Sequence, residues 1–167
     1  MRIRPESAGD EAAIGALTAA AFAGHPHSDG SEPQIIERLR RLGKLTLSLV
    51  AEDDGKIVGH VAFSPVTLSG GEGGWYGLGP ISVAPGRQRG GIGSTLIKTG
   101  LAKLEAQGAS GCALVGEPAY YNRFGFTARP ELTTMGVPPE YFLVLPLHGG
   151  APSGMVAFHP AFFGDAA

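Results

Sequence analysis

The segment Val83–Ser94, here called the glycine turn, constrains the fold more than any other, because it joins an apolar strand to an amphipathic helix through the run Gly90-Gly91-Ile92-Gly93. Glycine has no Cβ and lets the backbone approach a ligand closely. The first amides of the helix lack intrahelical acceptors and lie at the positive end of its dipole. Arg87 and Arg89 add two cations. The turn therefore predicts a phosphate-binding helix N-terminus, and we disfavour a plain glycine-rich connector because two arginines flank the glycines.

The composition limits the class of protein. A chain of 167 residues, 43% of them hydrophobic, suits a single domain over residues 1–167 with a sizeable core. A net charge of -2 argues against a general nucleic-acid binder, which needs a basic excess. The single Cys112 cannot form an internal disulfide, and neither a signal peptide nor a membrane-spanning apolar run is visible. We therefore expect a cytoplasmic protein that binds neither nucleic acid nor membrane.

The hydrophobic periodicity and the turn residues predict alternating strands and helices. Strands are expected over 1–5, 45–52, 57–68, 75–83, 112–115, 141–147 and 155–158, and helices over 10–22, 32–42, 92–107 and 117–126. The strands over 45–83 form an antiparallel meander through the hairpin turn Asp53–Lys56. The strand–turn–helix–strand order over 75–115 predicts a right-handed crossover with a parallel strand pair. Ligands of such sheets bind at the carboxyl ends of the strands, where the glycine turn lies.

The strand before the glycine turn is irregular. Gly77, Gly79 and Pro80 weaken it as a ladder strand, and proline in a sheet indicates an edge or a bulge. Bulges often lie beside active sites. A bulge here frees backbone groups of Ile81 and Val83 to bond a ligand, and a plain edge strand is the alternative.

Several polar residues have both a structural and a functional interpretation. His60 alternates with apolar neighbours and is first a structural strand histidine, second a catalytic base. His25 and His27 could ligate a metal, but we favour solvated loop histidines because no cysteine or third histidine stands nearby, so no metal is expected. The arginines of the 32–42 helix are interpreted as a solvated face. Of the adjacent Tyr120 and Tyr121, one can pack while the other faces a cleft as a general acid, and two packing tyrosines are the alternative.

Two common nucleotide-binding patterns do not fit the glycine turn. A dinucleotide fingerprint needs a third glycine, but Gly91-Ile92-Gly93 is followed by Ser94, Thr95 and Leu96. A P-loop needs Gly-Lys-Ser/Thr, which is absent.

A third pattern does fit. Gln88-Arg89-Gly90-Gly91-Ile92-Gly93 matches Q/R-x-x-G-x-G/A, and Tyr121–Phe126 matches Y-x-x-x-G-F. Together they resemble the GCN5-related N-acetyltransferase (GNAT) superfamily, and the run Gly116–Phe126 resembles its YhbS-like subgroup. The resemblance extends over the whole chain in element order and is strongest over residues 78–94 and 112–126. It implies an α/β fold with a mixed, mostly antiparallel central sheet, a parallel strand pair at the cofactor cleft, and helices on both faces.

The resemblance also implies a set of site residues. The backbone amides of the glycine turn would hold the pyrophosphate of acetyl-CoA, and the preceding strand segment would pair with the pantetheine arm and polarise the thioester carbonyl. The implied cofactor-binding residues are Ile81, Ser82, Val83, Gln88, Arg89, Gly90, Gly91, Ile92, Gly93 and Ser94. Tyr121 would protonate the leaving thiolate.

The chain departs from the family pattern in its general base. Many members carry a glutamate on the strand before the turn, and Trp75–Val83 contains no carboxylate. Many also carry an asparagine after the next strand, where this chain has Gly116-Glu117-Pro118. Glu117 is therefore the catalytic candidate, acting through water, with a surface carboxylate that caps the short helix as the alternative. His25, His27 and Glu32 are candidates for the acceptor side.

The resulting hypothesis is an acetyl-CoA-dependent N-acetyltransferase that acts directly on a primary amine of a small molecule or peptide. A non-catalytic acyl-CoA-binding module is one alternative, because no base is visible. An acetyltransferase toxin acting on tRNA is another, which the acidic net charge disfavours. No motif identifies the acceptor, and a homodimer is left open.

Overall fold

The computed structural model describes residues 1–164 and divides them into two compact units. Among the described residues, the first unit contains Met1–Ser64, Gly79–Gly100 and residues 160–164; the second contains Pro65–Leu78 and Leu101–His159. Each unit is described by itself, and the expectation of a single domain stays a prediction. No helix within residues 1–164 combines the length and apolarity needed to cross a membrane.

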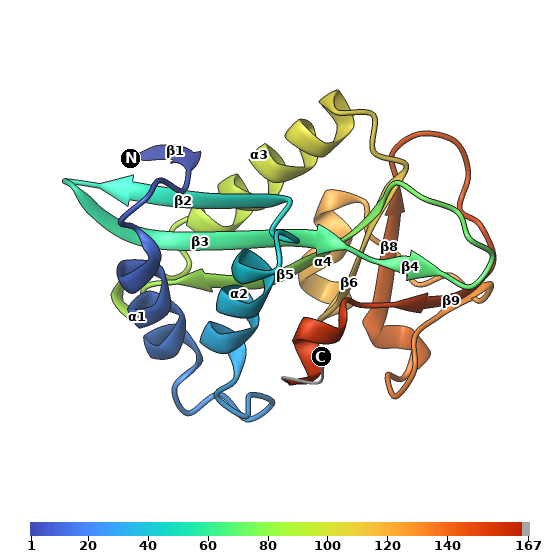
Figure 1. The fold of residues 1–167 in the computed structure, drawn as a ribbon, viewed down its shortest axis with the longest axis horizontal. Helices are drawn as coiled ribbons and strands as arrows, with labels where there is room; N and C mark the ends of the chain where they lie inside the picture. Colours follow the sequence, from blue (N-terminus) through green and yellow to red (C-terminus); the bar gives the residue numbers. More distant parts are fainter. Residues whose placement is uncertain (165–167) are drawn as a thin grey trace. The chain divides into compact units, whose positions relative to one another are not determined.

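The first unit is built on an antiparallel sheet. Its strands are β1 (Arg2–Pro5), β2 (Leu47–Asp53), β3 (Lys56–Pro65) and the end of β5 (Trp75–Val83), in the order β1-β2-β3-β5. β2 and β3 form a long hairpin (Figure 1). In its register Val50 lies opposite His60. Its turn contains Asp54 and Gly55 at φ 50° and 75°, so the predicted Asp-Gly hairpin is confirmed.

Helices pack on both faces of this sheet. α1 (Glu11–Phe22) and α2 (Glu32–Arg41) cover one face, where Ile14 and Ile36 pack on Val50. α3 (Ile92–Ala106) lies on the other face, close to β3. A Cβ on Gly59 would come within 2.7 Å of the Ile92 side chain, so only glycine allows this close approach.

The second unit holds the parallel strand pair. β6 (Gly111–Val115) runs parallel to the start of β5, with Trp75 opposite Gly111, and β8 (Phe142–Pro146) pairs antiparallel with β6. A smaller sheet has the order β4 (Thr67–Leu68), β9 (Gly154–Ala157), β7 (Leu132–Thr133). One hydrophobic cluster of this unit contains the buried residues Val66, Leu68, Trp75, Ala113, Leu132, Phe142, Val144 and Val156. The helical turns α4 (Pro118–Tyr121) and Asn122–Phe124 follow β6 and end at Gly125, whose φ is 95°.

The structure corrects two expectations. The predicted strand over 57–68 is two strands, because β3 ends at Pro65, which has no N–H for the ladder, and β4 belongs to the smaller sheet. The last predicted strand is present as β9 and lies in that smaller sheet. The alternative that β5 is a plain edge strand is wrong, because β5 has hydrogen-bonded neighbours on both sides. Its irregularity is local: Gly79 has φ 137° and precedes a cis peptide bond to Pro80.

Candidate active site

The glycine turn lies entirely within the first unit and is exposed from Pro85 to Gly91. A 3₁₀ turn over Pro85–Arg87 starts it, and α3 begins at Ile92. The first amide that bonds back into the helix is Thr95 N–H, which donates to the Gly91 carbonyl at 3.0 Å. By helix geometry the amides before Thr95 have no intrahelical acceptor, so they are available to an anion.

The backbone of the turn needs glycine at one position in particular. Gly91 has φ +86°, a left-handed conformation that side chains disfavour, and nothing lies within 4 Å of where its Cβ would be. Arg89 adopts φ 67° as well, which is uncommon for a residue other than glycine. Strained residues of this kind are held in place by their surroundings and cluster at ligand sites.

The two arginines of the turn have different surroundings. Arg87 Nη2 lies 2.7 Å from Asp53 Oδ2 of the β2–β3 hairpin, and this ion pair lowers the pKa of Asp53. Among residues 1–164, Arg89 makes no ion pair or side-chain hydrogen bond, so its charge is free for a ligand. The Gln88 side chain folds back and donates to the Val83 carbonyl at 3.2 Å.

The strand segment before the turn is partly enclosed. Ile81 and Val83 are half-buried, whereas Ser82 is buried and its hydroxyl has no hydrogen-bond partner among the described residues. Ala84 N–H donates to the Val58 carbonyl at 2.9 Å, which fixes the register of β5 against β3. The binding role expected for Ile81, Ser82 and Val83 stays a prediction.

Tyr121 and Glu117 lie in the second unit. Tyr121 packs edge-on against Tyr120 and Phe126, and burial, with a contribution from Tyr120, raises the pKa of Tyr121 to about 12. The phenol is therefore protonated at neutral pH. The Glu117 side chain makes no cap bond to α4; its backbone carbonyl, not its carboxylate, accepts from Tyr120 and Tyr121 N–H. Glu117 is thus an exposed surface carboxylate at the N-cap position of α4, as the alternative expected, but its side chain makes no cap hydrogen bond.

The histidine loop lies beside a small pocket of the first unit. His25 packs edge-on against Phe22, and its ring lies 6.1 Å from that of His27. A pocket of about 190 Å³ is lined by Glu32 among others, and Glu32 accepts a hydrogen bond from Ser28 at 2.7 Å. In the part of the chain that the structure describes, no three His, Cys, Asp or Glu side chains gather as a metal site would require.

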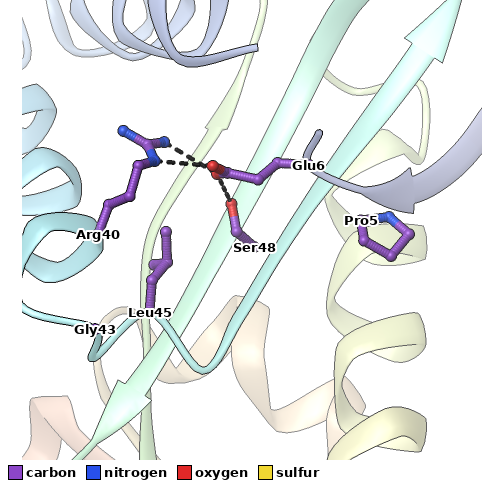
Figure 2. A pocket seen from close by; sticks show the side chains of 6 residues that line it. All are labelled: Pro5, Glu6, Arg40, Gly43, Leu45 and Ser48. Carbon is purple, nitrogen blue, oxygen red and sulfur yellow. Dashed lines mark hydrogen bonds and ion pairs between the residues drawn. The ribbon is translucent and has the colours of Figure 1, made fainter. Parts of the chain in front are cut away.

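A polar cluster that the sequence patterns missed lies on the helix-covered face of the same unit. The pocket of about 320 Å³ in Figure 2 is lined by Pro5, Glu6, Arg40, Gly43, Leu45 and Ser48. The Glu6 carboxylate lies between the Arg40 guanidinium and the Ser48 hydroxyl. Arg40 is therefore not part of a solvated face, contrary to expectation. These residues come from separate elements, so no local motif could have indicated the cluster.

His60 lies next to Ser48 and is fully buried, with its Nε2 2.8 Å from Ser48 Oγ. Burial lowers the pKa of His60 to about 4, although the nearby Glu6 opposes this shift. The imidazole is therefore neutral at physiological pH.

This buried histidine predicts a pH-dependent stability. The folded pKa lies below the unfolded value near 6.5, so the unfolded chain binds more protons between pH 6.5 and 4, and stability falls as the pH falls. From pH 7.5 to 5 we expect a loss of about 2 kcal/mol in the free energy of unfolding, measured by urea denaturation. His60→Gln should remove most of that slope, and an unchanged slope would contradict the burial of a neutral imidazole.

The described residues fit a pyrophosphate-bearing ligand at the glycine turn. This turn combines three features: the unpaired amides before Thr95, the open space beside Gly91 and the unpaired charge of Arg89. Within residues 1–164, the carboxylate that forms an ion pair with the turn is Asp53, which Arg87 neutralises.

Comparison with known proteins agrees with this arrangement. Residues 2–129 match the model of the acetyltransferase (GNAT) domain. The chain is 39% identical to the "Uncharacterized N-acetyltransferase YhbS" of Escherichia coli K12 over 127 residues, which cover 75% of this chain and 73% of the relative.

Two solved structures are similar over nearly the whole chain. A GNAT-family acetyltransferase from Brucella melitensis, in complex with acetyl-CoA, is 48% identical with a TM-score of 0.87, covering 96% of this chain and 97% of that one. E. coli YhbS in complex with CoA is 33% identical with a TM-score of 0.88, covering 99% and 93%. Family, sequence relatives and fold agree, and the chain belongs to the GNAT family of N-acetyltransferases.

Proposed function

We propose that this protein transfers the acetyl group of acetyl-CoA directly to a primary amine of a small molecule or peptide. The observation that carries the proposal is the exposed glycine turn, with unpaired helix amides, an open Gly91 and an unpaired Arg89 among the described residues. The Brucella structure with acetyl-CoA and the E. coli structure with CoA support the choice of ligand. The family match extends through parts of both units, which supports one acetyltransferase domain over residues 1–167.

Each part of the chain has a role in this proposal. The backbone amides from Gln88 to Ser94 bind the pyrophosphate, and Arg89 balances its charge. The segment Ile81–Val83 holds the pantetheine arm and donates a backbone N–H to the developing oxyanion. Acetyl-CoA supplies an acyl carbon that is activated as a thioester. Tyr121 donates a proton to the sulfur, and Glu117 is the carboxylate candidate for the base.

The test is an acceptor screen at saturating acetyl-CoA, with release of the CoA thiol as the readout. We expect acetyl-CoA to raise the melting temperature and at least one of benzylamine, spermidine or an alanine-led tetrapeptide to accelerate thiol release. Stabilisation by acetyl-CoA without turnover of any amine would instead favour a non-catalytic acyl-CoA-binding module. We place this activity in the cytoplasm, in keeping with the free, buried Cys112.

A further inference from the structure

Among the residues that the structure describes, His60 is the one buried titratable side chain of the first unit's sheet that the proposed roles leave unused. Its side chain has no exposed surface, and its Nδ1 has no hydrogen-bond partner among the described residues. A buried polar atom without a partner costs free energy, so such an atom calls for an explanation.

The neighbours of His60 determine which ring nitrogen carries the proton. The Glu6 carboxylate only accepts hydrogen bonds, so the single hydroxyl proton of Ser48 points to Glu6 Oε1. Ser48 Oγ must then accept from His60, over the 2.8 Å to Nε2. In a neutral imidazole with Nε2 protonated, Nδ1 is a bare lone pair. The chain of bonds therefore presents a proton acceptor at Nδ1.

Arg40 holds the outer end of this chain in place. Its Nε and Nη2 donate to the two oxygens of Glu6 at 2.8 and 3.0 Å, a bidentate pair (Figure 2). The pair fixes the carboxylate, and the carboxylate fixes the direction of the Ser48 hydroxyl. Burial and the charge of Arg40 disfavour a proton on His60, whereas the negative charge of Glu6 favours it, as a carboxylate stabilises an imidazolium in a catalytic triad.

The register of the sheet brings His60 next to the segment proposed to hold the thioester. Ala84 lies opposite Val58 through their backbone hydrogen bond, so two residues further along Ser82 lies opposite His60 on the same face. The Ser82 hydroxyl is also buried and without a partner among residues 1–164. Directly opposite side chains on paired strands have Cβ atoms about 5 Å apart. Two buried polar side chains with unused hydrogen-bonding capacity, one on β3 and one on β5, therefore lie opposite each other.

We propose that His60 is the general base of the acetyl transfer, that its Nδ1 takes the proton from the acceptor amine, and that Ser48, Glu6 and Arg40 are positioning residues. This inference rests on the proposed function. The amine N–H and acyl–sulfur bonds break, and the N–acyl and S–H bonds form. The amine proton passes to Nδ1, the sulfur takes the Tyr121 proton, and both side chains regain their starting states by exchange with solvent.

The proposal accounts for the lack of a carboxylate on β5, because the base comes from β3 instead. The charged groups that act on His60 are Glu6, which follows β1, and Arg40 of α2. Ser48 of β2 and Ser82 of β5 are neutral. The proposed base is thus an imidazole that is uncharged at physiological pH and held in one tautomer, with a bare lone pair at Nδ1.

The test compares kcat and its pH profile in His60→Gln and the parent protein, with the fastest amine of the acceptor screen. We expect kcat to fall about 100-fold or more with the KM for acetyl-CoA changed less than about 3-fold. The residual rate of His60→Gln should rise about tenfold per pH unit while the parent rate stays flat, because only amine already deprotonated by solvent reacts. Glu117→Gln is the competing variant: if it, and not His60→Gln, shows the loss of kcat and the rise with pH, the base is Glu117 and the assignment to His60 is overturned.

Ser48 provides the matched variants. Ser48→Ala should lower kcat about 10-fold, and Ser48→Thr, which keeps the hydroxyl, should restore it. Ser64→Ala is the control, because Ser64 is a buried, unpartnered serine on the same strand and face as His60 and makes no contact with the chain of bonds. Equal losses in Ser48→Ala and Ser64→Ala would overturn the positioning role.

Nitrogen-15 NMR of histidine-labelled protein reads the tautomer directly, with His60→Gln identifying the signal. We expect a bare Nδ1 and a protonated Nε2 from pH 5.5 to 8. A protonated Nδ1 overturns the proposal whatever the activity. If the parent protein acetylates amines and His60→Gln keeps the parent's rate and pH profile, only the assignment of His60 as the base is overturned. If the parent protein binds acetyl-CoA but acetylates no amine, the proposed function is overturned, and the assignment of the base with it.

Discussion

Gly91→Glu should abolish acetyl-CoA binding, with affinity falling at least about 100-fold, or about 2.7 kcal/mol. Gly91 has φ +86° and stands immediately before α3, where the unpaired amides begin. A glutamate there adds backbone strain and places a carboxylate where the proposal needs a pyrophosphate. Isothermal titration calorimetry with acetyl-CoA measures the effect. The protein itself should still fold, because nothing in the structure lies within 4 Å of the new Cβ.

Two variants separate the causes. Gly91→Ala adds the strain without the charge and should weaken binding only modestly. Gly86→Glu adds the same charge to the same exposed turn, at a glycine that has open space around it and no positive φ. If Gly86→Glu weakens binding as much as Gly91→Glu, the effect is a general repulsion and the assignment of the first helical amides is wrong. Unchanged affinity in Gly91→Glu would exclude the glycine turn as the binding site.

The order and type of the elements could be predicted because the signals are local. The Asp-Gly turn and the glycines before Ile92 each act within a few residues, and the structure has a hairpin and a helix start at these places. The strand pairing of the chain after Pro65 could not be predicted in this way. Whether Thr67–Leu68 continues β3 or pairs with β9 depends on residues about 90 positions later, which periodicity does not contain.

The same distinction applies to the candidate site. The glycine turn is one continuous segment, so its residues could be named from the sequence. The cluster around Glu6 is assembled from four elements, through contacts such as Glu6 to Arg40 and Ser48 to His60 that no spacing rule describes. His60 itself was visible as a polar residue in an apolar strand. Its burial, the tautomer inferred for it and its unpartnered Nδ1 are what favour the interpretation of His60 as a catalytic base over that of a structural strand histidine.

Tyr121→Phe should slow turnover about 100-fold while leaving the affinity for acetyl-CoA within about 3-fold. The substitution removes one hydroxyl and keeps the ring that packs on Tyr120 and Phe126. The pKa near 12 keeps the phenol protonated, so it can donate to a thiolate at any pH at which the protein works. Rates below pH 10 should therefore show no loss from ionisation of Tyr121.

Tyr120→Phe is the matched control. Tyr120 lies next to Tyr121, and its ring supports the Arg123 guanidinium at 4.5 Å, a contact that phenylalanine keeps. Single-turnover kinetics, which separate binding from chemistry, should show the loss in Tyr121→Phe and parent-like rates in Tyr120→Phe. A phenol of pKa 12 is a weaker acid than a thiol in water. Tyr121 can therefore protonate the sulfur of CoA effectively only if burial in the site also raises the pKa of that thiol. If both variants match the parent, the proton reaches the sulfur from solvent, and Tyr121 serves only to pack the α4 turn.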